Sequence, residues 1–246
     1  MSKKPFGVIA TVFLAAGIAA GQAWKEKPFR EWDEKTVQKV LENSPWVRQV
    51  LVPASWRAKI GGDELMSASA GQPGASQRTG AGGGGSGGDT SAGGVEAPRV
   101  TFLVRWTSAT TIRQALARSA VLRGAMKDED VDKYLAQAPA DYQIVLLGQD
   151  MRPFADITEE ALKEKTFLKL KSSKQKLAPT RVEIQRSEDG KSIRLIVFHF
   201  AKKTEAGELT IPSAEKGVEF TCQAGPAYVQ ASFDLQKMSG KEGVEL

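Results

Sequence analysis

The chain contains one histidine and one cysteine, His199 and Cys222, which limits the side-chain chemistry that it can support. A Ser-His-Asp or Cys-His site needs an imidazole within hydrogen-bond reach of the nucleophile, so His199 is the candidate base. Residues 193–200 are apolar on both faces of the expected strand, and this pattern favours a structural histidine. A zinc site with two histidines is excluded, and so is a thiolate cluster.

Cys222 ends a run, residues 217–222, that predicts a strand. The simplest interpretation is a small buried apolar side chain. The alternatives are an intermolecular disulfide and a nucleophile with a base nearby. Since one thiol cannot form an internal disulfide, the core itself must stabilise the fold.

Alternating carboxylates at Asp128, Asp130 and Asp132 resemble the start of a calcium-binding loop. Such a loop requires glycine at its sixth position and a bidentate glutamate at its twelfth. These positions hold Lys133 and Pro139, so the match fails. Acidic residues at the start of a helix instead complement its dipole. We therefore expect no metal site and no cofactor.

Glycoside cleavage uses two carboxylates, but their separation in space decides whether they act together. The expected folded part offers Asp141, Asp150, Asp156, Glu183 and Glu219. None of them lies in a catalytic motif, so no catalytic residue is assigned.

Lysines recur between residues 163 and 176, at Lys163, Lys165, Lys169, Lys171, Lys174 and Lys176. One interpretation is contact with an anionic polymer or a lipid head group. The other is an edge strand that its lysines protect against unwanted pairing. The first interpretation makes candidate binding residues of Lys163, Lys165, Lys169 and Lys171.

Residues 24–66 predict a short helical segment rich in aromatic side chains. Asp33 is placed to cap a first helix, with Trp32 and Val37 at the two positions of a hydrophobic staple. The segment is too small to form a core alone. We therefore expect it to pack on the rest of the chain or to dock on a partner.

Ser44-Pro45 is typical of a second helix start, because proline is well tolerated at the first helical position. The apolar spacing that follows predicts a short helix which Pro53 ends. This helix presents Trp46, so Trp32 and Trp46 are the aromatic candidate binding residues.

Residues 67–98 are rich in glycine and serine and nearly free of apolar side chains, which predicts a disordered linker. Its glycines do not form a phosphate-binding loop, because neither Lys-Ser nor Lys-Thr follows them.

Residues 99–246 predict an α+β domain with a mostly antiparallel sheet. Ser108 is placed to start a helix that Gly124 ends, residues 128–136 predict a second helix, and Thr158 caps a third. The expected strands are 100–106, 142–147, 167–171, 181–186, 193–200, 217–222 and 228–235. Asp189-Gly190 and Gly225-Pro226 are expected hairpin turns.

Residues 1–23 have the pattern of a signal peptide: Lys3 and Lys4, an apolar run over 6–20, and a small-residue end at Ala23. The alternative is an uncleaved helix that anchors the chain in an inner membrane. The formal net charge is +5, and loss of Lys3 and Lys4 leaves +3. This excess is too small to indicate binding to nucleic acid.

Residues 31–41 together with Ser44-Pro45-Trp46 resemble the start of a family of uncharacterised exported bacterial proteins with an N-terminal W-x-E-K…S-P-W segment. Residues 104–106, 113–115 and 233–241 match further parts of that family. The resemblance implies bacterial export and a variable stretch between the motif and a C-terminal domain. It implies no catalytic residues.

These observations favour an exported periplasmic or extracellular protein that binds or scaffolds and is not an enzyme. The expected partner is a protein or an anionic envelope component, not nucleic acid, and the membrane is met only through the signal segment. The alternative hypothesis is a carboxylate-dependent hydrolase acting on an envelope polymer.

Overall fold

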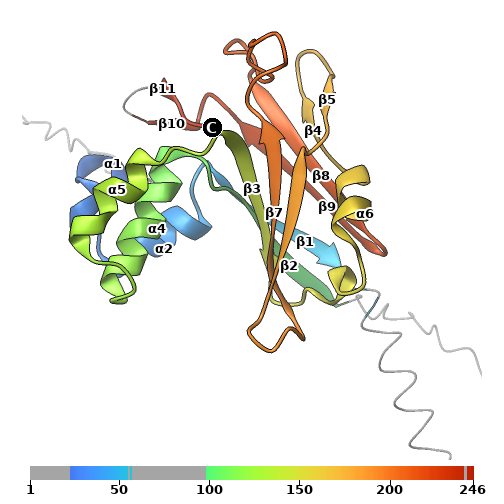
Figure 1. Ribbon diagram of the computed structural model, residues 1–246, viewed down its shortest axis with the longest axis horizontal. Coiled ribbons are helices and arrows are strands. Elements are labelled where there is room, and N and C mark those ends of the chain that lie inside the picture. The colour runs from blue at the N-terminus through green and yellow to red at the C-terminus, as the bar shows by residue number, and fades with distance from the viewer. Residues whose placement is uncertain (1–22, 55, 57–97, 241–242) are drawn as a thin grey trace, which may run out of the picture.

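The computed structural model describes residues 23–54, 56, 98–240 and 243–246 (Figure 1). Nearly all of the expected signal peptide and linker lie outside these residues. The helices and 3-10 turns are α1 (Ala23–Glu26), η1 (Phe29–Glu31), α2 (Glu34–Glu42), α4 (Thr110–Leu122), η2 (Asp128–Asp130), α5 (Val131–Ala136), η3 (Arg152–Phe154) and α6 (Glu159–Glu164). Among the described residues, no helix is long and apolar enough to cross a membrane.

The strands form two larger antiparallel sheets and one short hairpin. They are β1 (Val47–Pro53), β2 (Arg99–Trp106), β3 (Asp141–Gly148), β4 (Thr166–Leu170), β5 (Lys176–Leu177), β6 (Arg181–Arg186), β7 (Ile193–Ala201), β8 (Gly217–Ala224), β9 (Ala227–Asp234), β10 (Ser239–Gly240) and β11 (Gly243–Val244). The first sheet has the order β1-β2-β3-β7-β6 and the second β5-β4-β8-β9. The predicted α+β class is confirmed.

The core lies between these two sheets. Alternate residues of β2 face it, and Phe102, Val104 and Trp106 are fully buried. Ring pairs join the sheets, with centroids 5.3 Å apart for Phe198 and Phe220 and 5.5 Å apart for Trp106 and Phe233. Such edge-to-face pairs stabilise a core beyond the area that they bury.

Cys222 lies inside this core, as predicted, with none of its surface exposed. Burial raises the pKa of its thiol to about 12. Because the thiolate is the reactive form, a neutral buried thiol is a poor nucleophile. The structural interpretation of Cys222 is confirmed.

The first helix of the N-terminal segment is confirmed. The Asp33 side chain accepts a hydrogen bond of 2.8 Å from the Thr36 amide, and α2 begins at Glu34. Trp32 and Val37, the staple positions, are both 3% exposed. The segment packs on its own chain, because α2 contacts α4 and the Arg118 side chain of α4 donates to the Trp32 carbonyl at 2.9 Å.

The second predicted helix of this segment is wrong. Residues 47–53 form the edge strand β1, which pairs antiparallel with β2 from Val47 opposite Arg105 to Pro53 opposite Arg99. The helical spacing of the apolar residues was a local pattern, and the free edge of β2 overrides it. Val52 and Trp46 are buried as a result.

The predicted start of α4 at Ser108 is also wrong. The helix begins at Thr110, and the Ser108 hydroxyl accepts instead from the Gln143 amide at 3.1 Å. The end is as predicted, because Gly124 follows with a φ of +71°, a backbone conformation that favours glycine. Thr158 caps α6 through a 3.2 Å bond from the Ala161 amide, also as predicted.

Helices α1, α2, α4 and α5 gather beside the five-stranded sheet, and α6 lies across the molecule from them (Figure 1). The C-terminal end of the chain lies between this group of helices and the strands. This position brings the last residues against the start of α4.

Candidate functional site

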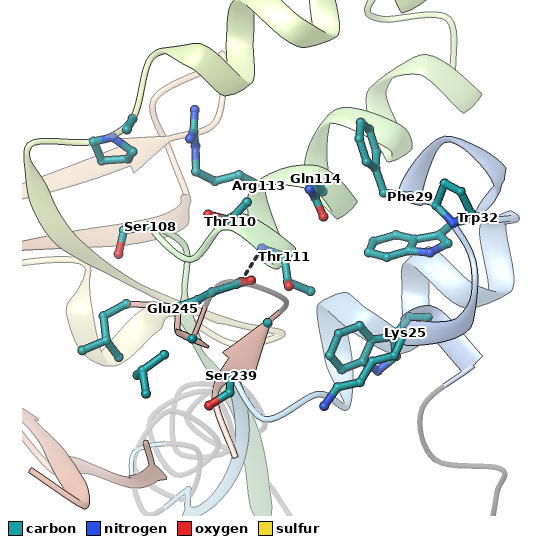
Figure 2. Close-up of a pocket in the computed structure, with 18 of the residues that line it drawn as sticks. Lys25, Phe29, Trp32, Ser108, Thr110, Thr111, Arg113, Gln114, Ser239 and Glu245 are labelled. Carbon is teal, nitrogen blue, oxygen red and sulfur yellow. Dashed lines mark hydrogen bonds between the residues drawn. The ribbon is translucent and has the colours of Figure 1, made fainter. Parts of the chain in front are cut away.

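A cavity of about 620 Å³ lies where distant segments of the chain meet. They are the N-terminal stretch 24–32, the start of α4 with its preceding loop, Ala138-Pro139 with Lys202, and residues 239–240 and 243–246. We call this cavity the basic pocket. Figure 2 shows Lys25, Phe29 and Trp32 on one side of it, Ser108 and Glu245 on the other, and Thr111 and Gln114 between.

One wall of the basic pocket is aromatic. It consists of Trp24, Phe29 and Trp32. Trp24 stands edge-on to Trp46 at 5.3 Å, and Phe29 stands edge-on to Trp32 at 6.4 Å, measured between ring centroids. The indole nitrogen of Trp32 donates to the Lys27 carbonyl at 3.2 Å. These contacts fix the wall, in which Trp24 and Trp32 are buried and Phe29 is partly exposed.

Four cationic side chains line the pocket: Lys25, Lys27, Arg113 and Lys202. Lys25 and Lys27 are exposed, and the Lys25 ammonium lies 5.2 Å from the Trp24 ring centroid. Lys202 is half-buried and donates to the Pro139 carbonyl at 3.0 Å. Burial, and next the charge of Arg113, lowers the pKa of Lys202. The pocket therefore has a positive potential.

Arg113 is the buried member of this set, with 6% of its surface exposed. Its guanidinium donates to the carbonyls of Tyr134 at 2.6 Å, Leu135 at 2.9 Å and Gln137 at 2.9 Å. These carbonyls lie at the end of α5, where a helix leaves acceptors without partners. Arg113 thus ties α5 to α4 and places a positive charge behind the pocket.

Glu245 is the acidic side chain among the described residues that line the pocket. Its carboxylate accepts a 2.8 Å hydrogen bond from the Thr111 amide in the first turn of α4. A helix N-terminus favours a negative charge at this position. The Glu245 carbonyl also accepts from the indole nitrogen of Trp46 at 3.0 Å.

The structure brings the two predicted tryptophans to the pocket region. Trp32 lines the cavity, while Trp46 is fully buried beside it. The four predicted lysines lie elsewhere. Lys163 is on α6, Lys165 follows it, Lys169 is on β4 opposite Glu219, and Lys171 follows β4. None of the four is among the described residues that line the basic pocket.

Sequence reasoning missed Lys25, Lys27, Lys202 and Glu245. The alternation of Lys25 and Lys27 beside Trp24 and Phe29 was the available signal for the first two. No sequence signal marked Glu245, because glutamate is a common residue on protein surfaces.

His199 is a buried strand histidine, as predicted, with 3% of its surface exposed. Its Nε2 lies 3.3 Å from a Glu183 carboxylate oxygen, and its Nδ1 lies 3.8 Å from one of Asp141. Arg181 forms an ion pair with Glu183 and also contacts the ring. Neither carboxylate is among the described residues that line the basic pocket.

Burial, and next the charge of Arg181, lowers the pKa of His199 below its ordinary 6.5. The unfolded chain therefore binds a proton at a higher pH than the folded chain does. We expect the free energy of unfolding to fall as pH drops from 7.5 to 5.5. His199→Gln should reduce this pH dependence, as measured by urea unfolding at both values. If the free energy of unfolding depends on pH equally in the wild type and in His199→Gln, this pH dependence does not come from His199.

The described residues contain no group of three or more His, Cys, Asp or Glu side chains that could hold a metal ion. Comparison with protein-family models, with curated proteins and with solved structures finds no match to this chain.

Proposed function

We propose that this protein is an exported, non-enzymatic binding module whose basic pocket takes a ligand that carries a carboxylate. The observation that carries the proposal is the composition of the cavity: four cationic side chains and an aromatic wall line it together with the Glu245 side chain. Export is supported by the signal-peptide pattern of residues 1–23.

The aromatic wall favours a ligand with an apolar body beside its charge. Trp24, Phe29 and Trp32 supply apolar surface, while Lys25 and Lys27 are exposed and can reach an anionic group. Ligand sites commonly combine an apolar lining with a few placed polar groups. A carboxylate is the expected anion because the pocket already holds one, at the Thr111 amide.

The residue types that line the cavity favour binding without catalysis. The single histidine and the single cysteine of the chain, His199 and Cys222, both lie in strands away from it. Acyl transfer through an imidazole and a nucleophile needs such groups at the site. Glu245, the pocket carboxylate, is engaged by a helix amide.

The proposal is tested by titrating the protein with N-acetylglutamate α-amide while tryptophan fluorescence is recorded, since Trp24 and Trp32 line the pocket. We expect saturable binding with Kd on the order of 1 mM or below. N-acetylglutamine amide, the uncharged match, should bind more weakly. Joint replacement of Lys25 and Lys27 by alanine should lower affinity about twofold to thirtyfold, since each exposed ion pair contributes about 0.2–1 kcal/mol.

Joint replacement of Lys169 and Lys171 by alanine is the matched control, because it removes the same charge far from the pocket. That variant should bind as the wild type does. If the two probes bind equally well, or if the Lys169 and Lys171 pair controls affinity instead, the basic pocket is not the site.

A further inference from the structure

We infer that the ligand is an extended peptide segment with a glutamate between apolar residues, and that residues 243–246 are a built-in competitor for the same place. This inference rests on the proposed function. These residues, Gly243-Val244-Glu245-Leu246, are called the tail below.

The pocket recognises the tail through its main chain as well as its charge. The Thr111 amide donates to the Glu245 carboxylate, and the Trp46 indole donates to the Glu245 carbonyl. A simple anion would offer only the first of these acceptors. A peptide offers both, with the spacing that one glutamate residue provides, and this favours a peptide over a small acid.

The tail also pairs as a strand. Ser239 lies opposite Val244, Gly240 lies opposite Gly243, and the Glu245 amide donates to the Met238 carbonyl at 2.8 Å. A peptide in the place of the tail would add to β10 in the same way, since strand addition supplies main-chain hydrogen bonds and side-chain pockets supply specificity.

Part of the tail lies open to solvent. Both residues of strand β11 are exposed, and Val244 is 52% exposed. Segments with little buried apolar surface open at low free energy. A tethered segment of this kind acts as a competitor at a high effective concentration, so it lowers the apparent affinity for a ligand in trans.

Gly240 makes the shared place testable, because it lines the pocket beside the tail glutamate. A β-carbon built on Gly240 would collide with the Glu245 carboxylate. Gly240 is not among the residues with positive φ, so alanine is compatible with its backbone. Gly240→Ala should therefore keep a glutamate carboxylate away from the Thr111 amide, whether it belongs to the tail or to a bound peptide.

The test is a titration of the full chain with the peptide acetyl-Gly-Val-Glu-Leu-amide, whose single carboxylate is that of the glutamate. Glu245→Gln should raise the affinity for this peptide about two- to fivefold, the size of a charge–dipole interaction at a helix end. Gly240→Ala should lower it, because the added methyl group excludes the peptide glutamate. Acetyl-Gly-Val-Gln-Leu-amide should bind each protein more weakly. Thermal unfolding of each variant shows whether it is folded.

Glu219→Gln is the matched control, because Glu219 lies opposite Lys169 on the second sheet. It should leave peptide affinity unchanged. If N-acetylglutamate α-amide binds but Glu245→Gln does not raise peptide affinity, the competitor role is wrong and the proposed function stands. If Gly240→Ala does not lower peptide affinity, the peptide does not take the place of the tail. If the glutamine peptide binds as well as the glutamate peptide, the peptide class is wrong. If no probe binds any variant, the proposed function itself is wrong.

Discussion

Trp46→Ala is expected to lower the free energy of unfolding by about 3–5 kcal/mol, the usual loss when a large core aromatic is truncated. Trp46 is fully buried, packs edge-on against Trp24, and donates its indole proton to the Glu245 carbonyl. The substitution therefore leaves a cavity and an acceptor without its donor. At about 2–4 °C per kcal/mol for a chain of this size, the midpoint of thermal unfolding should drop by roughly 6–20 °C.

The control for this prediction lies on the strand that follows Trp46. Leu51 of β1 is 61% exposed, so Leu51→Ala should change stability by about 0.5 kcal/mol or less. Trp32→Ala should also destabilise the protein, because Trp32 is 3% exposed. If both tryptophan variants unfold as the wild type does, the N-terminal segment does not pack on its own chain.

Arg113→Met is expected to lower the free energy of unfolding by about 3–5 kcal/mol, because three carbonyls lose their donor and each unsatisfied acceptor costs about 1–3 kcal/mol. The guanidinium donates to three carbonyls at the end of α5, and methionine would fill the space but donate to none of them. Since α5 has six residues, it cannot persist without tertiary contacts. Hydrogen exchange should show a loss of protection at residues 131–136.

Arg123→Met is the matched control, because Arg123 is an exposed arginine that follows the same helix, α4. Its side chain donates to the Ser119 carbonyl at 3.2 Å, a contact of local range. Unfolding should change little in this variant. If α5 keeps its wild-type protection from hydrogen exchange in Arg113→Met, the three carbonyl contacts are not needed to hold this helix.

The elements that the sequence predicts well are those that local signals determine. Asp33 and Thr158 cap α2 and α6 as expected, and Gly190, with φ of +70°, lies at the turn between β6 and β7. Cap and turn geometry involves residues only a few positions apart, so sequence spacing specifies it.

Strand β1 was missed because its pairing partner is distant in sequence. Val47 and Val50 have helical spacing, but they pair with Arg105 and Phe102, which lie beyond the glycine-rich stretch. Local propensity is a weak prior that tertiary pairing overrides, particularly at a free sheet edge.

The pocket could be anticipated only in part. The sequence makes Trp32 and Trp46 candidate binding residues, and both lie at or beside the cavity. Lys202 and Glu245 meet Lys25 only because β7 and the tail fold back onto the N-terminal stretch. The spacing of residues within one segment cannot predict that distant segments come together in the fold. The lysines between residues 163 and 176 are dense in the sequence, but none of the four candidates is among the described residues that line the pocket.

A crystal structure of the Glu245→Gln protein with acetyl-Gly-Val-Glu-Leu-amide bound is the most direct measurement of what the basic pocket holds. We predict that the peptide carboxylate lies about 3 Å from the Thr111 amide, within reach of Lys25 or Lys27, with the tail displaced. A peptide bound at another surface, or a tail still in place while the pocket stays free of peptide at saturation, would contradict the proposed function.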